Sequence, residues 1–354
     1  MKNLFFSLFV FVTAFAFQFR ETMLSSNFKF APKENLSEYG FFKGKLADQI
    51  PAEGVIPYRL NTPLFSDYAE KLRFVKLPVG QTIPYNDKEV LAFPVGAIII
   101  KTFYYPLDFR QPDAGRRIME TRLLVHEERG WKALEYVWND DQSDAYLEVA
   151  GETKEISWIH NDGKKRTIQY TMPNLNQCKG CHNRNEQMIP IGPSARQLNG
   201  DFHYVENGQK TVDNQLTHWQ KLGVLTDLPP LENVPKAAVW NDPASGSLDA
   251  RARVWLDINC AHCHSNQGPA KTSGLILSHN ETDLTKLGVM KAPVAAGKGS
   301  GGRQYSIVPG QPDKSILLYR LESSDPSEMM PELGRKTTHV EGAALVREWI
   351  KAMK

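Results

Sequence analysis

The first half of the chain carries its apolar residues in short runs that are rich in β-branched and aromatic side chains. Such runs, bounded by Gly, Pro, Asn and Asp, are typical of β-strands. They cover residues 94–105, 118–126, 131–138 and 165–172. The last run follows Asn161-Asp162-Gly163, which favours a tight hairpin turn. The pattern predicts an antiparallel β domain over residues 28–190.

The C-terminal part of the chain has the spacing of amphipathic helices instead. Ser247 is a favourable N-cap for the first of three segments with helical periodicity. These segments cover residues 248–258, 315–321 and 341–353. They predict an all-α domain over residues 246–354, and the Pro-rich stretch 191–245 indicates a connector. The predicted fold class is therefore α+β and multidomain, with the antiparallel β domain first.

Length and charge fit this division. A chain of 354 residues is too long for one ordinary core and suits two domains. The formal net charge of +2 is close to neutral, and no cluster of Lys and Arg resembles a phosphate-binding stripe. Nucleic acid is not an expected partner.

The N-terminus has the pattern of a secretory signal peptide. Lys2 precedes the apolar run Leu4 to Phe17, and Ala14-Phe15-Ala16 supplies a small-x-small cleavage pattern. We expect a signal peptide over residues 1–20, a periplasmic protein, and no stable membrane insertion after signal removal. An uncleaved N-terminal anchor is the alternative, although the run is shorter than the ~20 residues that span a bilayer.

All four cysteines lie in two C-x-x-C pairs, and a histidine follows each pair directly. The motifs are Cys178-Lys179-Gly180-Cys181-His182 and Cys260-Ala261-His262-Cys263-His264. Two thiols at this spacing add across the vinyl groups on one edge of a porphyrin, and the next imidazole reaches the iron. The motifs predict two covalently bound haem c groups, with His182 and His264 as iron ligands. A Cys₄ zinc site, a pair of redox-active dithiols and two structural disulfides remain as alternatives.

The second iron ligand of each haem is less constrained by the sequence. Met330 lies in a predicted loop between two helices, and Pro331 restricts it to an extended conformation that suits an inward-projecting thioether. Met329 is its competitor, and core packing is the alternative for both. For the first haem, Met188 is a candidate for the second iron ligand, and His160 and His203 are weaker candidates. If none of them binds, His182 is the only protein ligand of that iron.

The two motifs, together with the regions that surround them, resemble known cytochrome families. Residues from about 248 onward resemble a class I cytochrome c domain, which implies a helical fold around one haem with His264 proximal and Met330 distal. Residues 80–185 are similar to cytochrome c′-β, with weak matches outside Cys178-Lys179-Gly180-Cys181-His182. The order of all regions resembles a family of bacterial dihaem cytochromes over nearly the whole mature chain.

These features predict electron transfer between redox partner proteins, because two redox centres are present without a recognisable acid, base or nucleophile constellation. The alternative is a haem enzyme that acts on peroxide, nitric oxide or hydroxylamine at an open first haem. A third hypothesis, in which the β domain recognises a carbohydrate or protein, is supported only by Tyr104 and Tyr105.

Overall fold

A six-stranded sheet forms the centre of the computed structural model, which describes residues 28–206 and 208–354. Its order is β3-β4-β6-β7-β8-β9, and every neighbouring pair is antiparallel. The strands are β3 (Val55–Tyr58), β4 (Glu70–Lys76), β6 (Ile98–Pro106), β7 (Arg116–Glu127), β8 (Gly130–Trp138) and β9 (Ala145–Glu148). The strands predicted over 94–105, 118–126 and 131–138 are thus confirmed as β6, β7 and β8. The predicted signal peptide, residues 1–20, lies outside the described residues.

Short two-stranded sheets surround the central one. Each is antiparallel except the pair of β5 with β16, which is parallel. Their strands are β1 (Phe42–Lys43), β2 (Ile50–Pro51), β5 (Ile83–Pro84), β10 (Glu152–Ile159), β11 (Lys165–Met172), β12 (Asn183–Arg184), β13 (Gln187–Met188), β14 (Asp201–Glu206), β15 (Gln209–Asn214) and β16 (Leu225–Thr226). The predicted strand over 165–172 is β11, and its hairpin turn lies at the predicted Asn-Asp-Gly.

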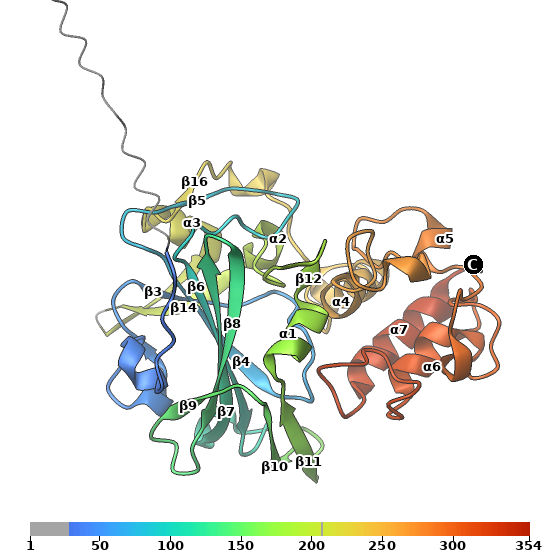
Figure 1. Cartoon of the computed structure of the whole chain (residues 1–354). Coiled ribbons are helices and arrows are strands. Elements are labelled where there is room, and N and C mark those ends of the chain that lie inside the picture. The colour runs from blue at the N-terminus through green and yellow to red at the C-terminus, as the bar shows by residue number, and fades with distance from the viewer. Residues whose placement is uncertain (1–27, 207) are drawn as a thin grey trace, which may run out of the picture.

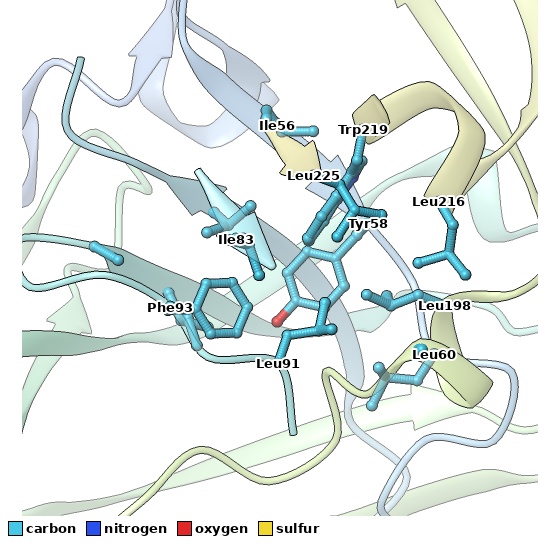
Figure 2. Packing of buried hydrophobic residues seen from close by; sticks show 14 of the residues in the cluster. Ile56, Tyr58, Leu60, Ile83, Leu91, Phe93, Leu198, Leu216, Trp219 and Leu225 are labelled. Atoms are coloured by element: carbon cyan, nitrogen blue, oxygen red, sulfur yellow. The ribbon is translucent and has the colours of Figure 1, made fainter. Parts of the chain in front are cut away.

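The stretch 191–245 differs from the connector that its composition indicated. It contains helices α2 (Ala195–Leu198) and α3 (Gln215–Lys221), which pack against the upper part of the sheet. Figure 2 shows Leu198, Leu216 and Trp219 in one cluster with side chains from β3 and β5. The packed core of the β region therefore extends well beyond residue 190. The helical spacing of Leu216 and Trp219 covers only about one turn, which is too short to stand out among the Pro and Gly residues of the stretch.

Helices make up the last part of the chain, shown in orange and red in Figure 1. They are α4 (Leu248–Leu256), α5 (Leu284–Leu287), α6 (Ile316–Glu322) and α7 (Val340–Ala352). Helices α4, α6 and α7 pack around Trp255, Leu318, Val346 and Ile350, as the predicted apolar faces require. The Trp349 indole N–H donates to Asp249 at 2.7 Å and ties α7 to the first turn of α4.

Polar contacts join the two parts of the molecule. Asp67, from the loop before β4, accepts hydrogen bonds from the segment before α7, and Phe65 N donates to Asn259 Oδ1 at 2.9 Å. Arg196 forms an ion pair with Asp257. Among the residues that the structure describes, no helix has the length and apolarity needed to cross a membrane.

Candidate functional site

The first motif lies on helix α1 (Leu175–Cys181), between the sheet and the C-terminal helices (Figure 1). Asn174 caps this helix: its side chain accepts from Gln177 N at 3.0 Å, and the Gln177 side chain accepts from Asn174 N at 2.9 Å. This capping box fixes where the helix begins. Cys178 and Cys181 are three residues apart and lie on one side of it, so their thiols are presented together.

A tight hairpin orients the histidine of the first motif. Strands β12 and β13 are joined through Asn185 and Glu186, both with positive φ, and the chain returns Ile189 to His182. The His182 Nδ1 lies 2.7 Å from the Ile189 carbonyl oxygen, which can only accept, so Nδ1 carries the proton. Burial, and after it the charge of Lys101, lowers the pKa of His182 to about 3. The ring is therefore neutral, with the lone pair of Nε2 available to a metal.

The second motif begins at the end of α4, as predicted. Ser247 is the N-cap and accepts from Ala250 N at 3.1 Å. The helix then widens into a π-helical turn, Asp257–Ala261, a feature often found at functional sites. This turn carries Cys260, and His264 N donates to the Cys260 carbonyl at 2.8 Å. The two cysteines and the histidine thus follow one another within a single compact turn.

A cavity of about 330 Å³ lies at this turn, within the usual range of cofactor pockets. Cys260, Cys263 and His264 line it from the motif, and Met330 lines it from the loop after α6. The apolar part of the wall includes Leu275, Leu277, Ile316, Leu317 and Leu321. Met329 is 5 % exposed and is not part of the wall. Of the two methionines weighed from the sequence, Met330 is the one that reaches this cavity.

Ser273 orients the ring of His264, a role that no feature of the sequence indicated. The Ser273 hydroxyl donates to the Ala270 carbonyl at 2.7 Å, so its oxygen acts as acceptor toward His264 Nδ1 at 3.2 Å. Burial, and after it the charge of Arg320, lowers the pKa of His264 to about 4. This ring is also neutral, with Nδ1 protonated and the lone pair on Nε2.

Arg335 holds the loop that carries Met330. Its guanidinium is 5 % exposed and donates to the carbonyls of Met330 at 2.8 Å, Arg320 at 3.0 Å and Ser323 at 2.9 Å. Met330 N in turn donates to the Arg320 carbonyl at 3.0 Å. The main chain at Met330 is therefore fixed on both sides. Sequence reasoning missed Arg335, because an arginine in a polar loop has the pattern of a solvated surface residue.

The two motifs lie against each other, although they are far apart in the sequence. The Cys263 Sγ is 3.9 Å from the Gly180 carbonyl oxygen, and Gly180 and Cys181 contribute to the wall of the cavity at the second motif. Cys181 and His262 also line a second, more polar cavity of about 420 Å³. The fold thus brings all six predicted Cys and His residues into one region, with Met330 beside the second motif.

The surroundings of the four thiols bear on the alternatives that the sequence left open. All four cysteines are free. Within the described ranges, no group of three or more His, Cys, Asp and Glu residues is arranged to hold a metal ion. Burial raises the pKa of the Cys260 and Cys263 thiols to about 12 and also raises that of Cys178 and Cys181. A redox-active dithiol needs the opposite shift, because the thiolate is the reactive form.

The weaker candidate ligands lie in different places. Met188 is on β13, close to the first motif in the chain. His160 is buried at the contact between the two parts, where its Nε2 lies 3.6 Å from Glu341 and its ring contacts Tyr68. His203 is exposed on β14. Neither histidine contributes to the two cavities at the motifs.

Comparisons of the chain with models of protein families, with curated proteins and with solved structures find no match.

Proposed function

We propose that the protein is a dihaem c-type cytochrome, exported to the periplasm, that transfers electrons between redox partner proteins. The cavity at the second motif carries this proposal: two thiols, a neutral imidazole and the thioether of Met330 all contribute to its wall. This donor set fits a haem attached at Cys260 and Cys263. A bound haem supplies a one-electron iron couple, whose potential a thioether ligand raises.

The chain's own residues prepare this site. Ser273 sets the tautomer and orientation of His264, and Arg335 fixes the main chain at Met330. The apolar wall keeps water away and lowers the local dielectric. At the first motif, Cys178, Cys181 and His182 are the corresponding residues, with the Ile189 carbonyl in the role of Ser273.

The proposal is tested by the mass of the denatured full-length protein and by its absorption spectrum in alkaline pyridine. We expect two covalently attached haems. Cys178→Ala with Cys181→Ala should remove one, and Cys260→Ala with Cys263→Ala should remove the other. A wild-type protein purified from a host competent for haem attachment with one haem or none would overturn the dihaem proposal.

A second function, a haem enzyme acting on a small ligand, is favoured by one observation. Lys101 and Arg122 lie close enough to the first motif to perturb the pKa of His182, and cations so placed stabilise an anionic ligand. This function requires a high-spin ferric signal from one iron, and addition of cyanide should convert it to low spin. Two low-spin signals that cyanide leaves unchanged would exclude it.

A further inference from the structure

One face of the central sheet carries a row of charged residues. Across the strands, Arg73 pairs with Lys101, Lys101 with Arg122, and Arg122 with Glu135. Directly paired residues on antiparallel strands point to the same face. Lys71, two residues before Arg73 on β4, shares this face. Four cations are therefore gathered on three neighbouring strands.

The aromatic ring of Phe103 lies among these cations. The Lys101 Nζ is 5.1 Å from its centroid, the Lys71 Nζ is 5.8 Å and the Arg122 Cζ is 4.3 Å. The ring attracts each cation weakly but carries no net charge. It brings the positive groups together without neutralising them.

Acidic side chains on this face neutralise only part of the charge. Glu120 forms an ion pair with Arg122 at 2.5 Å. Burial, and after it the charge of Glu120, raises the pKa of Glu135 to about 9, so this carboxyl is protonated at neutral pH. Glu70 is exposed and alternates to the other face of β4, from where it acts electrostatically on Lys71 and Arg73 without forming an ion pair with either. Three cations have no ion pair with any residue that the structure describes: Lys71, Arg73 and Lys101.

Such an arrangement is costly without an anion. Arg73 is 8 % exposed, and Lys71 and Lys101 are partly buried. Burial is the largest cause that lowers the pKa of Lys71 and of Lys101 to about 7. An unpaired ammonium group that is withdrawn from water either loses its proton, in the direction of these pKa shifts, or is compensated by an anion. A carboxylate between these cations would offset their mutual repulsion through charge-assisted hydrogen bonds.

This face of the sheet lies toward the first motif. Helix α1 packs on β8, next to the row, and Figure 1 shows it between the sheet and the C-terminal helices. Lys101 is near enough to the Cys178 thiol and the His182 ring to act on both electrostatically. A group attached at the first motif therefore has Lys101 and Arg122 as cationic neighbours, and Arg73 and Lys71 continue the row from Lys101 onto β4.

We propose that Lys71, Arg73 and Lys101 form a carboxylate-binding site beside the first motif. Two sources share this chemistry: the propionates of a haem attached at Cys178 and Cys181, and a free small dicarboxylate. The first source rests on the proposed function, whereas the second does not.

The first arm of the test measures the midpoint potential of the first haem in the full-length protein. Lys101→Gln and Lys71→Gln should both lower it, because loss of a cation near the propionates favours the ferric state. Lys101→Arg keeps the charge and should leave the potential unchanged. Lys76→Gln is the matched control, since Lys76 lies on β4 but on the opposite face, 5.7 Å from the Phe41 ring. Using both positions keeps the test valid if one variant fails to fold.

The second arm measures binding of succinate by calorimetry to the same proteins. Saturable binding that K101Q weakens at least tenfold and K76Q leaves unchanged would identify a free carboxylate as the ligand. If K101Q and K71Q match K76Q in both potential and succinate binding while the mass still shows two haems, the inference is wrong and the proposed function stands. If the mass shows no haem, the proposed function fails, and succinate binding alone decides whether the site exists.

Discussion

The contact between Asp67 and the segment before α7 gives the sharpest stability prediction. Asp67 is 4 % exposed, and its Oδ1 accepts from Lys336 N at 2.7 Å, Thr337 N at 2.8 Å and Thr337 Oγ1 at 3.0 Å. Lys336 N also lies 2.9 Å from Oδ2. An asparagine in this position has to direct its NH₂ group at an N–H donor whichever way it is turned.

Asp67→Asn therefore loses the carboxylate charge and at least one hydrogen bond to it. A hydrogen bond to a charged group contributes about 1.5–3 kcal/mol, so we expect a loss of about 2 kcal/mol in the free energy of unfolding. The midpoint of thermal unfolding should fall by roughly 3 °C. Because the segment continues from the loop held by Arg335, the methionine-to-iron absorption band expected under the proposed function should also weaken.

Asp140→Asn is the control for this measurement. The Asp140 side chain is 86 % exposed, and its ion pair with Arg117 lies at the surface. Exposed ion pairs contribute at most about 1 kcal/mol, so the control should unfold close to the wild type. A D67N protein with wild-type unfolding and an intact band would refute the idea that the β region helps to position the Met330 loop.

Three further predictions concern the second site and its surroundings. Under the proposed function, Met330→Ala should abolish the methionine-to-iron band and lower the potential of one haem, whereas Met329→Ala should reduce stability and keep the band. An unchanged M330A spectrum means that another residue is the ligand. Ser273→Ala should raise that potential, because His264 loses the hydrogen bond that increases its basicity, and an equal or lower potential contradicts this role. Burial lowers the pKa of His339 to about 4, so the unfolded state binds more protons between pH 6.5 and 4. Up to about 3 kcal/mol of stability should therefore be lost as the pH falls through this window, and denaturant titrations should show a weaker pH dependence for His339→Gln.

The sequence predicted the elements whose patterns are local. Residues 165–172 formed a strand because a turn sequence and alternating side chains both favoured it, and Ser247 capped α4 because capping involves only the next few residues. Strand β4 was missed because Glu70, Lys71, Arg73 and Lys76 give it the composition of a solvated segment. Arg73 is buried through the pairing of β4 with β6, a long-range contact that no local pattern specifies.

The same distinction holds within the candidate site. The Cys and His residues of the two motifs could be selected from their spacing, since the proposed covalent attachment of haem requires that spacing. Ser273 and Arg335 act through loop geometry that only the folded chain defines. Trp219 fills the core from a segment whose Pro-rich composition indicated a connector, because its burial depends on contacts with β3 and β5 that composition does not show.

The two parts meet through aromatic contacts, such as Phe65 stacked on His339, and through polar contacts, and the polar ones have a structural consequence. Asp67, Asn259 and the Arg196–Asp257 pair are directional contacts, which stabilise less than apolar packing but fix one arrangement. An apolar surface of similar area would tolerate sliding. The arrangement that these contacts fix is the one in which Gly180 lies against Cys263. Under the proposed function, electron exchange between the motifs depends on their separation, which these directional contacts hold constant.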